Sequence, residues 1–210
     1  MKTKDNMSSE EKVISAAVEE FAALGYAGAR VDTIAEKAKV NKAMIYYHFK
    51  SKEQLYERIL KDITSNIFTQ IRDAAVAEGD PMDVLNSIIS RYMDMLDGFD
   101  KSFFQIMMRE IASGGEYFKK IALPNLVLPV FSIVAPLINS AIEEGRMREL
   151  NPFYTFLQII GGVVFFNIIR IPLDGTDLAK LIFKDGYLDA YKENFFKILK
   201  NGLELKGENL

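Results

Sequence analysis

The chain of 210 residues contains no cysteine and a single histidine, His48. Without cysteine, disulfide bonds, thiolate zinc sites and iron–sulfur clusters are excluded. With one histidine, no catalytic triad or histidine metal cluster assembles from the spacing, so we expect no catalytic residue, no metal site and no cofactor. No apolar segment of a secretory signal follows the first twelve residues, MKTKDNMSSEEK, which favours a cytoplasmic protein.

Negative charges slightly outnumber positive ones, 29 against 26, but the positive charges are concentrated in one segment. The whole chain has a net charge of −3 and an isoelectric point of about 5.4. Residues 28–61 contain eight lysines and arginines against four carboxylates, a net +4, so the remainder carries −7. A locally basic module on an acidic chain suits a protein that binds nucleic acid at one site, although a merely solvated basic surface would have the same charge.

Helical spacing dominates the N-terminal third. Ser8-x-x-Glu11 is a capping box, and it precedes an apolar stripe that ends at Gly25. A second, shorter stripe follows, and Asn41 can then cap a third helix. Ser51-x-x-Gln54 is a second capping box, which opens a long connecting helix over about residues 51–78, ending near Gly79. The expected inward residues of the four helices are Ile14, Ala17, Phe21 and Leu24; Val31, Ile34, Ala35 and Ala38; Ile45 and Phe49; and Leu55, Ile59, Ile63, Ile67 and Ile71.

Two short helices around a turn near Lys39 predict a helix-turn-helix. Because Ile45 and Phe49 face the core, the third helix presents its other face outward. On that face Ala43 allows close approach to a major groove, and Met44 can touch a thymine methyl. Tyrosine hydroxyls, the imidazole of His48 and the ammonium of Lys52 suit phosphate oxygens.

These residues resemble the DNA-binding domain of TetR-type (tetracycline-repressor-like) transcriptional regulators. The strings AAVEEFAALGYAGARVDTIAEKAKV and NKAMIYYHFKSKEQLY carry the resemblance, within residues 10–60. It implies that Lys42, Ala43 and Met44 address bases, that Tyr47, His48 and Lys52 hold phosphates, and that Tyr46 lies at the edge of that set. The candidate DNA-binding residues are therefore Arg30, Thr33, Lys42, Ala43, Met44, Tyr46, Tyr47, His48 and Lys52.

The chain departs from the family pattern at two places. Lys39 occupies the turn position that usually holds glycine, so a residue with a Cβ is expected in the left-handed conformation, at a cost of about 1 kcal/mol. Arg30 and Val31 stand where the family commonly places a capping threonine or serine. Neither offers a capping hydroxyl, so we expect Arg30 to replace the usual phosphate contact.

The rest of the chain also predicts helices, and we expect an all-α fold. Asp80-Pro81 and Asn151-Pro152 each place a cap before a proline, starting helices that end near Gly98 and Ile171. Further helices are expected over about residues 101–113 and 187–205. The expected domains are a helix-turn-helix domain at residues 1–55 and an all-helical effector-binding and dimerisation domain at residues 56–210.

Two segments lack charged residues for long enough to span a bilayer, Ile121–Ile142 and Leu150–Ile169. The first contains three prolines and the second contains Gly161-Gly162 and Asn167. The residues between them give no clear positive-inside bias. These features favour two buried helices, apolar all round because they pack on every side, over a membrane hairpin.

Bulky, soft side chains gather in the same half of the chain. Methionine and phenylalanine at helical spacing are often plain core, but three prolines that can kink one helix favour an adaptable apolar pocket. An inward-facing arginine there would favour a carboxylate on the ligand, whereas outward-facing arginines favour a neutral or cationic ligand. Arg91 and Glu110 could instead pair with each other. The candidate ligand-binding residues are Arg91, Met93, Phe103, Met107, Glu110, Phe131, Phe165 and Asn167.

The sequence thus predicts a homodimeric regulator, most simply a repressor. It would bind a palindromic double-stranded DNA operator and release it when a small apolar effector binds. We expect the homodimer to form through the last two long helices, and we expect no association with a membrane. An enzyme finds little support. A helical carrier of lipids or other ligands would explain the apolar half but not the Tyr46-Tyr47-His48-Phe49-Lys50 block.

Overall fold

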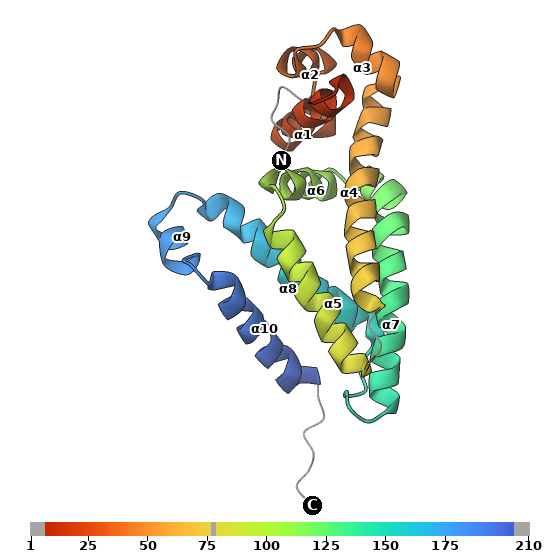
Figure 1. The fold of residues 1–210 in the computed structure, drawn as a ribbon, viewed down its shortest axis with the longest axis vertical. Helices are drawn as coiled ribbons and strands as arrows, with labels where there is room; N and C mark the ends of the chain where they lie inside the picture. The colour runs from red at the N-terminus through yellow and green to blue at the C-terminus, as the bar shows by residue number, and fades with distance from the viewer. Residues whose placement is uncertain (1–6, 77–78, 204–210) are drawn as a thin grey trace, which may run out of the picture. The chain divides into compact units, whose positions relative to one another are not determined.

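The computed structural model describes residues 7–76 and 79–203. All the secondary-structure elements in those ranges are helices (Figure 1). This confirms the all-α prediction. The elements are α1 (Ser9–Gly28), α2 (Val31–Ala38), α3 (Lys42–Phe49), α4 (Lys52–Ala75), α5 (Pro81–Asp97), α6 (Lys101–Ala112), the π-helix η2 (Phe118–Val127), α7 (Leu128–Glu143), α8 (Pro152–Leu173), α9 (Asp177–Ile182) and α10 (Tyr187–Leu203).

The chain forms two compact units. Unit 1 comprises residues up to Asn66 together with Asp100–Leu126, and unit 2 comprises Ile67–Phe99 and the residues from Val127 onward. Helix α4 therefore contributes to both units, and α6 belongs with the N-terminal helices. The functional boundary at residue 55 stays a prediction, because these units are defined by packing alone.

Unit 1 is built around one apolar core. Helix α1 packs against α2, α3 and α6. The core side chains come from α1 to α4, and Ile106, Tyr117 and Ile121 add to them from α6 and the segment after it. The predicted caps form: Ser8 and Glu11 make the reciprocal capping box, and Asn41 Oδ1 accepts from the amide of Ala43 at 2.8 Å. Local sequence thus determines where these helices begin.

The predicted inward position of Leu24 is wrong, since its side chain is 52% exposed. Helix α1 is interrupted at Gly25, whose φ of 71° is a conformation that glycine adopts without steric cost. Beyond this interruption Tyr26 packs against the core in place of Leu24, with its ring 5.2 Å from that of Tyr56 and 4.9 Å from that of Tyr117. The helical period assigns Leu24 to the core, but the interruption at the next residue brings Tyr26 there instead.

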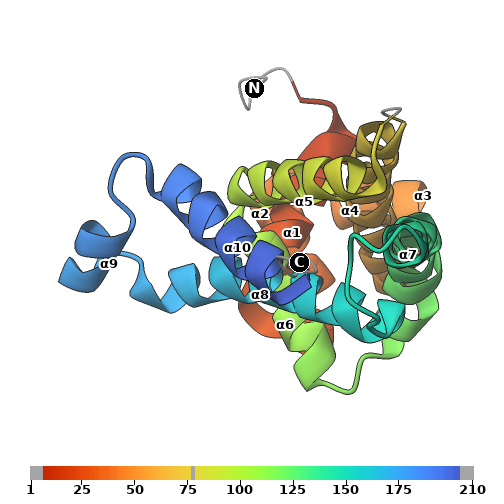
Figure 2. The same cartoon turned by 90° about the horizontal axis from the view of Figure 1, so that it is seen from below.

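Unit 2 is built on α5, which packs against α7, α8 and α10. Asp80 and Asn151 cap α5 and α8 as predicted, each followed by its proline. The predicted end of the connecting helix near Gly79 falls partly on residues 77–78, outside the described residues, and α4 ends at Ala75. Residues 204–205 of the predicted last helix also lie outside them. Helix α9, capped by Thr176, was not predicted. In both views it forms part of the connection between α8 and α10 (Figures 1 and 2).

The prediction that the two uncharged helices are buried on every side is wrong for the single chain. Two segments are long and apolar enough to span a membrane, Phe118–Glu143 and Pro152–Leu173, but length and composition alone are weak support for a span. Only 28% and 22% of the most apolar 18-residue stretch of each segment is buried. Tyr154 and Phe165 on α8 are 64% and 63% exposed. The apolar surface of α8 is therefore available to a partner.

Candidate nucleic-acid interface

Helix α3 is anchored through one face and open on the other. Ile45 is fully buried and Phe49 is 5% exposed, as the spacing predicts. On the opposite face Met44, Tyr46 and Tyr47 are 36%, 43% and 79% exposed. Large apolar and aromatic side chains at such exposure on a helix of eight residues form a surface that a partner can cover.

The turn before α3 has the predicted left-handed residue. Lys39 has φ 55° and ψ 43°, and its amide donates to the carbonyls of Ala35 and Glu36 at the end of α2. The amide of Val40 also donates to Ala35 at 3.0 Å. Arg30, at the N-cap of α2, makes no capping hydrogen bond with its side chain. Both departures from the family pattern therefore keep the helix-turn-helix geometry.

Lys42 lies at the start of α3 and pairs with Asp32 of α2. Its Nζ lies 2.7 Å from Asp32 Oδ1, and both side chains are exposed. This hydrogen bond raises the pKa of Lys42 and lowers that of Asp32, so both groups are charged at neutral pH. The lysine is thus oriented at the outer edge of the two short helices.

Lys52 and His48 differ in their hydrogen bonding: the Lys52 ammonium has two carbonyl partners, whereas Nε2 of His48 has none among the described residues. The ammonium of Lys52 donates to the carbonyl oxygens of Tyr26 at 2.8 Å and Ala29 at 3.1 Å, and it lies 4.5 Å from the centre of the Tyr26 ring. Nε2 of His48 is buried and has no hydrogen-bond partner within the described protein.

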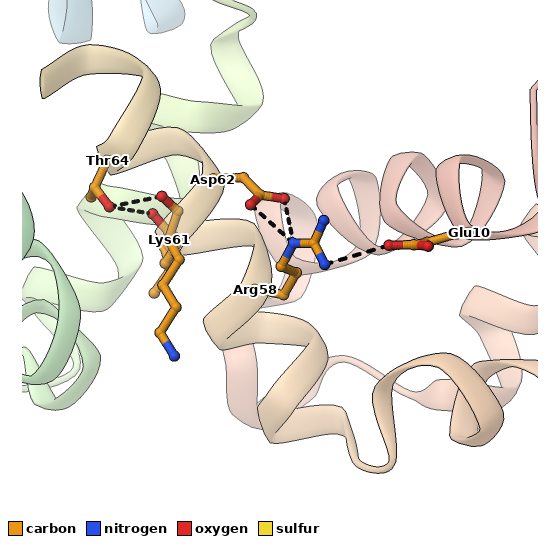
Figure 3. A network of polar contacts seen from close by, with 6 residues as sticks. Glu10, Arg58, Lys61, Asp62 and Thr64 are labelled. Atoms are coloured by element: carbon orange, nitrogen blue, oxygen red, sulfur yellow. Dashed lines mark hydrogen bonds and ion pairs between the residues drawn. The ribbon is translucent and has the colours of Figure 1, made fainter. Parts of the chain in front are cut away.

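Ion pairs connect the helices behind this surface. Arg58 on α4 binds Asp62 through Nε at 2.8 Å and reaches Glu10 on α1 through a terminal nitrogen at 3.5 Å (Figure 3). The Nζ of Lys37 on α2 donates to Oε2 of Glu20 on α1 at 2.7 Å, and Glu20 is only 3% exposed. Because all five residues belong to unit 1, these pairs help to hold α1, α2 and the first part of α4 together.

Three of the eight candidate ligand-binding residues belong to unit 1. Glu110 is 4% exposed, and its carboxylate accepts from the amides of Tyr117 at 2.7 Å and Phe118 at 3.2 Å and from the hydroxyl of Tyr56 at 3.3 Å. Burial beside this carboxylate raises the pKa of Tyr56. Met107 packs against the unit 1 core, and the ring of Phe103 contacts that of Phe104.

The other five candidates belong to unit 2. Met93 is buried, and Phe131 packs against the rings of Phe153 and Phe156. Asn167 is buried and donates to the carbonyl of Val163, whereas Phe165 is exposed. Arg91 is exposed and lines a polar groove of about 440 Å³ with Gln70, Asp73, Ala74, Ser87, Ser90 and Asp94. The ligand-binding role of all eight residues stays a prediction.

Sequence reasoning missed the polar contacts between distant residues. Arg109 Nε donates to the carbonyl of Ala22 at 2.7 Å, which joins α6 to α1. In unit 2, Asp97 accepts hydrogen bonds from Arg170 and Tyr187. The partners are separated by 87, 73 and 90 positions. No local spacing indicates them.

The comparison with known proteins decides the identity of this surface. Residues 13–59, which include α2 and α3, match the model of the bacterial regulatory proteins of the tetR family. These residues form a tetR-family domain. This confirms the resemblance that the aromatic-His-Phe block indicates, and the family consists of transcriptional regulators rather than enzymes.

Two curated relatives of the chain are regulators of transcription. The transcriptional repressor NicS of Pseudomonas putida is 27% identical over 183 residues, covering 85% of this chain and 83% of NicS. The transcriptional activator FasR of Mycolicibacterium smegmatis is 31% identical over 141 residues, covering 66% of this chain and 64% of FasR. The chain is accordingly a DNA-binding regulator of transcription with a helix-turn-helix, as predicted.

Solved structures share the whole fold. The regulator FadR from Bacillus subtilis, in complex with stearoyl-CoA, has a TM-score of 0.70 at 22% identity and covers 91% of this chain and 97% of its own. A ketosteroid transcriptional regulator of Mycobacterium tuberculosis has a TM-score of 0.72 at 20% identity, covering 95% and 96%. These similarities extend the family's fold beyond α4, to the C-terminal helices.

Proposed function

We propose that this regulator is a cytoplasmic homodimeric repressor, which binds a palindromic operator through α3 and releases it when a small, largely apolar ligand binds. The observation that carries the proposal is the open face of α3, where exposed Met44 and Tyr47 lie opposite the buried Ile45. The proposal assigns no catalysis and no cofactor to the chain.

The DNA contacts divide into two kinds. Lys42, Ala43 and Met44 lie in the first turn of α3 and read base edges in the major groove. Tyr47, His48 and Lys52 hold phosphates. Arg30 and Thr33 add contacts from α2, and Tyr46 lies at the edge of the set.

A homodimer follows from the exposed apolar surface of unit 2. Five large side chains of α8 are at least 39% exposed, and Ile198 of α10 is 65% exposed: the five are Phe153, Tyr154, Leu157, Phe165 and Ile169. A surface of this kind on a soluble regulator suits a self-association interface. Of the two adjacent glycines, Gly162 is already approached by Phe195 of the same chain, whereas Gly161 has open space around it. Gly161 can thus allow the backbone of a second copy to approach closely.

The effector is proposed to be neutral or cationic, with at most one or two polar groups. Arg91 is exposed, and Arg109 donates to a main-chain carbonyl, so both carry out roles other than binding a buried ligand carboxylate. One related fold is named a ketosteroid transcriptional regulator, which agrees with a largely apolar effector. Sugars and nucleotides would each bury several polar groups, at about 1–3 kcal/mol for every unpaired one.

Two experiments test the proposal. In a reporter strain, deletion of the gene should raise expression from its own upstream region, and a fall in expression would identify an activator instead. In thermal-shift screening, a lipophilic effector at a hundred times its Kd should stabilise the protein by about 2.7 kcal/mol. A response to sugars or nucleotides, with none to lipophilic compounds, would contradict the apolar effector.

A further inference from the structure

Asp97 connects three helices of unit 2. It is the last residue of α5, and one of its carboxylate oxygens accepts hydrogen bonds from the guanidinium of Arg170 on α8 and from the hydroxyl of Tyr187 on α10. Burial, together with the hydrogen bond to Asp97, raises the pKa of Tyr187 to about 12, so the hydroxyl keeps its proton at neutral pH. The side chains of Asp97 and Arg170 are 26% and 28% exposed, so water and solutes reach the pair.

Aromatic rings surround the guanidinium that binds Asp97. The central carbon of the Arg170 guanidinium lies 4.9 Å from the ring centre of Tyr187 and 5.6 Å from that of Phe183. The side-chain oxygen of Asn167 accepts a further hydrogen bond from Arg170 at 3.3 Å. A carboxylate beside two aromatic faces is the arrangement by which proteins bind organic cations, because the acid supplies charge and the rings supply cation–π attraction.

The segment that supplies Phe183 is held by little packing. Helix α9 has no buried residue among its six, and Leu181 is 71% exposed. The helix lies between Gly175 and Gly186, which have φ angles of 77° and 80°. A short element with no buried side chain opens at low free-energy cost, so Phe183 can move without unfolding the rest of unit 2.

We propose that Asp97, Phe183 and Tyr187 form a cage for an organic cation, which Arg170 fills in the free chain and which an aryl amidinium or guanidinium ligand can take over. This inference rests on the proposed function, since it names the polar group that the largely apolar effector would carry. Exchange of one cation for another leaves the charge of Asp97 paired throughout, which avoids the cost of an unpaired half-buried carboxylate.

Arg170 belongs to the same chain as the cage and competes with any ligand for it. A group attached to the same chain competes at an effective concentration in the millimolar range. The observed Kd is therefore weakened by the fraction of chains in which the cage is free. An aryl group strengthens the ligand because it adds apolar contact with the rings of Phe183 and Tyr187.

Removal of the resident cation tests the cage directly. Arg170→Ala frees Asp97 and both rings, and benzamidine is the probe, with uncharged benzamide as the control of matched shape. We expect calorimetry to give a Kd for benzamidine roughly tenfold or more lower in Arg170→Ala than in the wild type, and no binding of benzamide. Adding Asp97→Asn to Arg170→Ala should abolish the binding.

Arg72→Ala is a matched control, since it removes an exposed arginine of α4 that pairs with Asp73. It should leave the Kd for benzamidine at the wild-type value. If Arg170→Ala fails to fold by circular dichroism, Arg170→Gln serves in its place. A folded variant that binds benzamidine no better than the wild type, or equally well after Asp97→Asn, would overturn the cage. Because the assay contains no DNA, its result is independent of whether the protein represses transcription.

Discussion

The ammonium of Lys52 closes the end of α1, because it donates to the carbonyl of Tyr26 at 2.8 Å while lying over the ring of the same tyrosine. Carbonyls at the end of a helix lack partners within the helix, and a lysine there satisfies them and opposes the negative end of the helix dipole. Two of the three ammonium hydrogens bond Tyr26 and Ala29, and the third is available to a phosphate. Lys52 therefore combines a structural contact with its proposed DNA contact.

Lys52→Ala should weaken binding to all DNA sequences about equally. Loss of one phosphate contact should reduce the slope of log affinity against log salt by roughly one unit. Loss of the two carbonyl contacts should also reduce the free energy of unfolding by about 1 kcal/mol. Fluorescence anisotropy over a salt series measures the first effect, with Lys180→Ala on α9 as the control. An unchanged salt slope together with the stability loss would restrict Lys52 to the structural role.

Met44→Ala should change which operator variant is preferred, because a side chain in the major groove discriminates between bases. A lost thymine-methyl contact should cost about 1–3 kcal/mol on the preferred operator and less on variants without that thymine. Tyr47→Phe is the control, since its hydroxyl is assigned to a phosphate and its loss should affect all sequences alike. Equal losses for Met44→Ala on every operator variant would contradict base contact.

Glu110→Ala should be among the most destabilising substitutions in unit 1. It leaves the amides of Tyr117 and Phe118 without an acceptor, and each unsatisfied buried donor costs about 1–3 kcal/mol. Tyr56→Phe should cost about 1 kcal/mol, and the double variant should cost less than the two single variants together. Urea unfolding measures all three, and strict additivity would show that Tyr56 and Glu110 do not interact in solution.

The starts of α1, α3, α5 and α8 could be predicted because their signals are local. The caps at Ser8, Asn41, Asp80 and Asn151 act on amides two or three residues away, and each formed as the spacing indicates. The buried positions of α3, Ile45 and Phe49, are four residues apart and follow from the helical period. These are properties that a stretch of ten residues determines by itself.

Other features depend on residues far apart in the chain. The helical period assigns Leu24 to the core, but Tyr26 takes that place after the interruption at Gly25. The composition of α8 indicates burial without indicating what buries it. Contacts such as Arg109 to Ala22 and Arg170 to Asp97 arise from tertiary packing over more than seventy positions, and no spacing rule reaches that far.

Phe165→Asp should convert the proposed dimer to a monomer. A charge at this exposed position of α8 costs a monomer little, but in an apolar interface it would be desolvated without a partner. Sedimentation equilibrium at micromolar concentration measures the change. Val76→Asp is the control, because Val76 is 74% exposed and lies outside α8 and α10. A wild-type protein that is already monomeric would rule the interface out.

Sequence-specific DNA binding is tested most directly by the binding of the purified protein to the region upstream of its own gene. We predict a retarded complex with two chains per palindromic site, at an affinity roughly 10³-fold or more above that for unrelated DNA at about 150 mM salt. It also predicts that Tyr47→Ala weakens binding to both DNAs alike. Equal affinity of the wild type for the upstream region and for unrelated DNA would contradict the assignment of α3 as a sequence-reading helix.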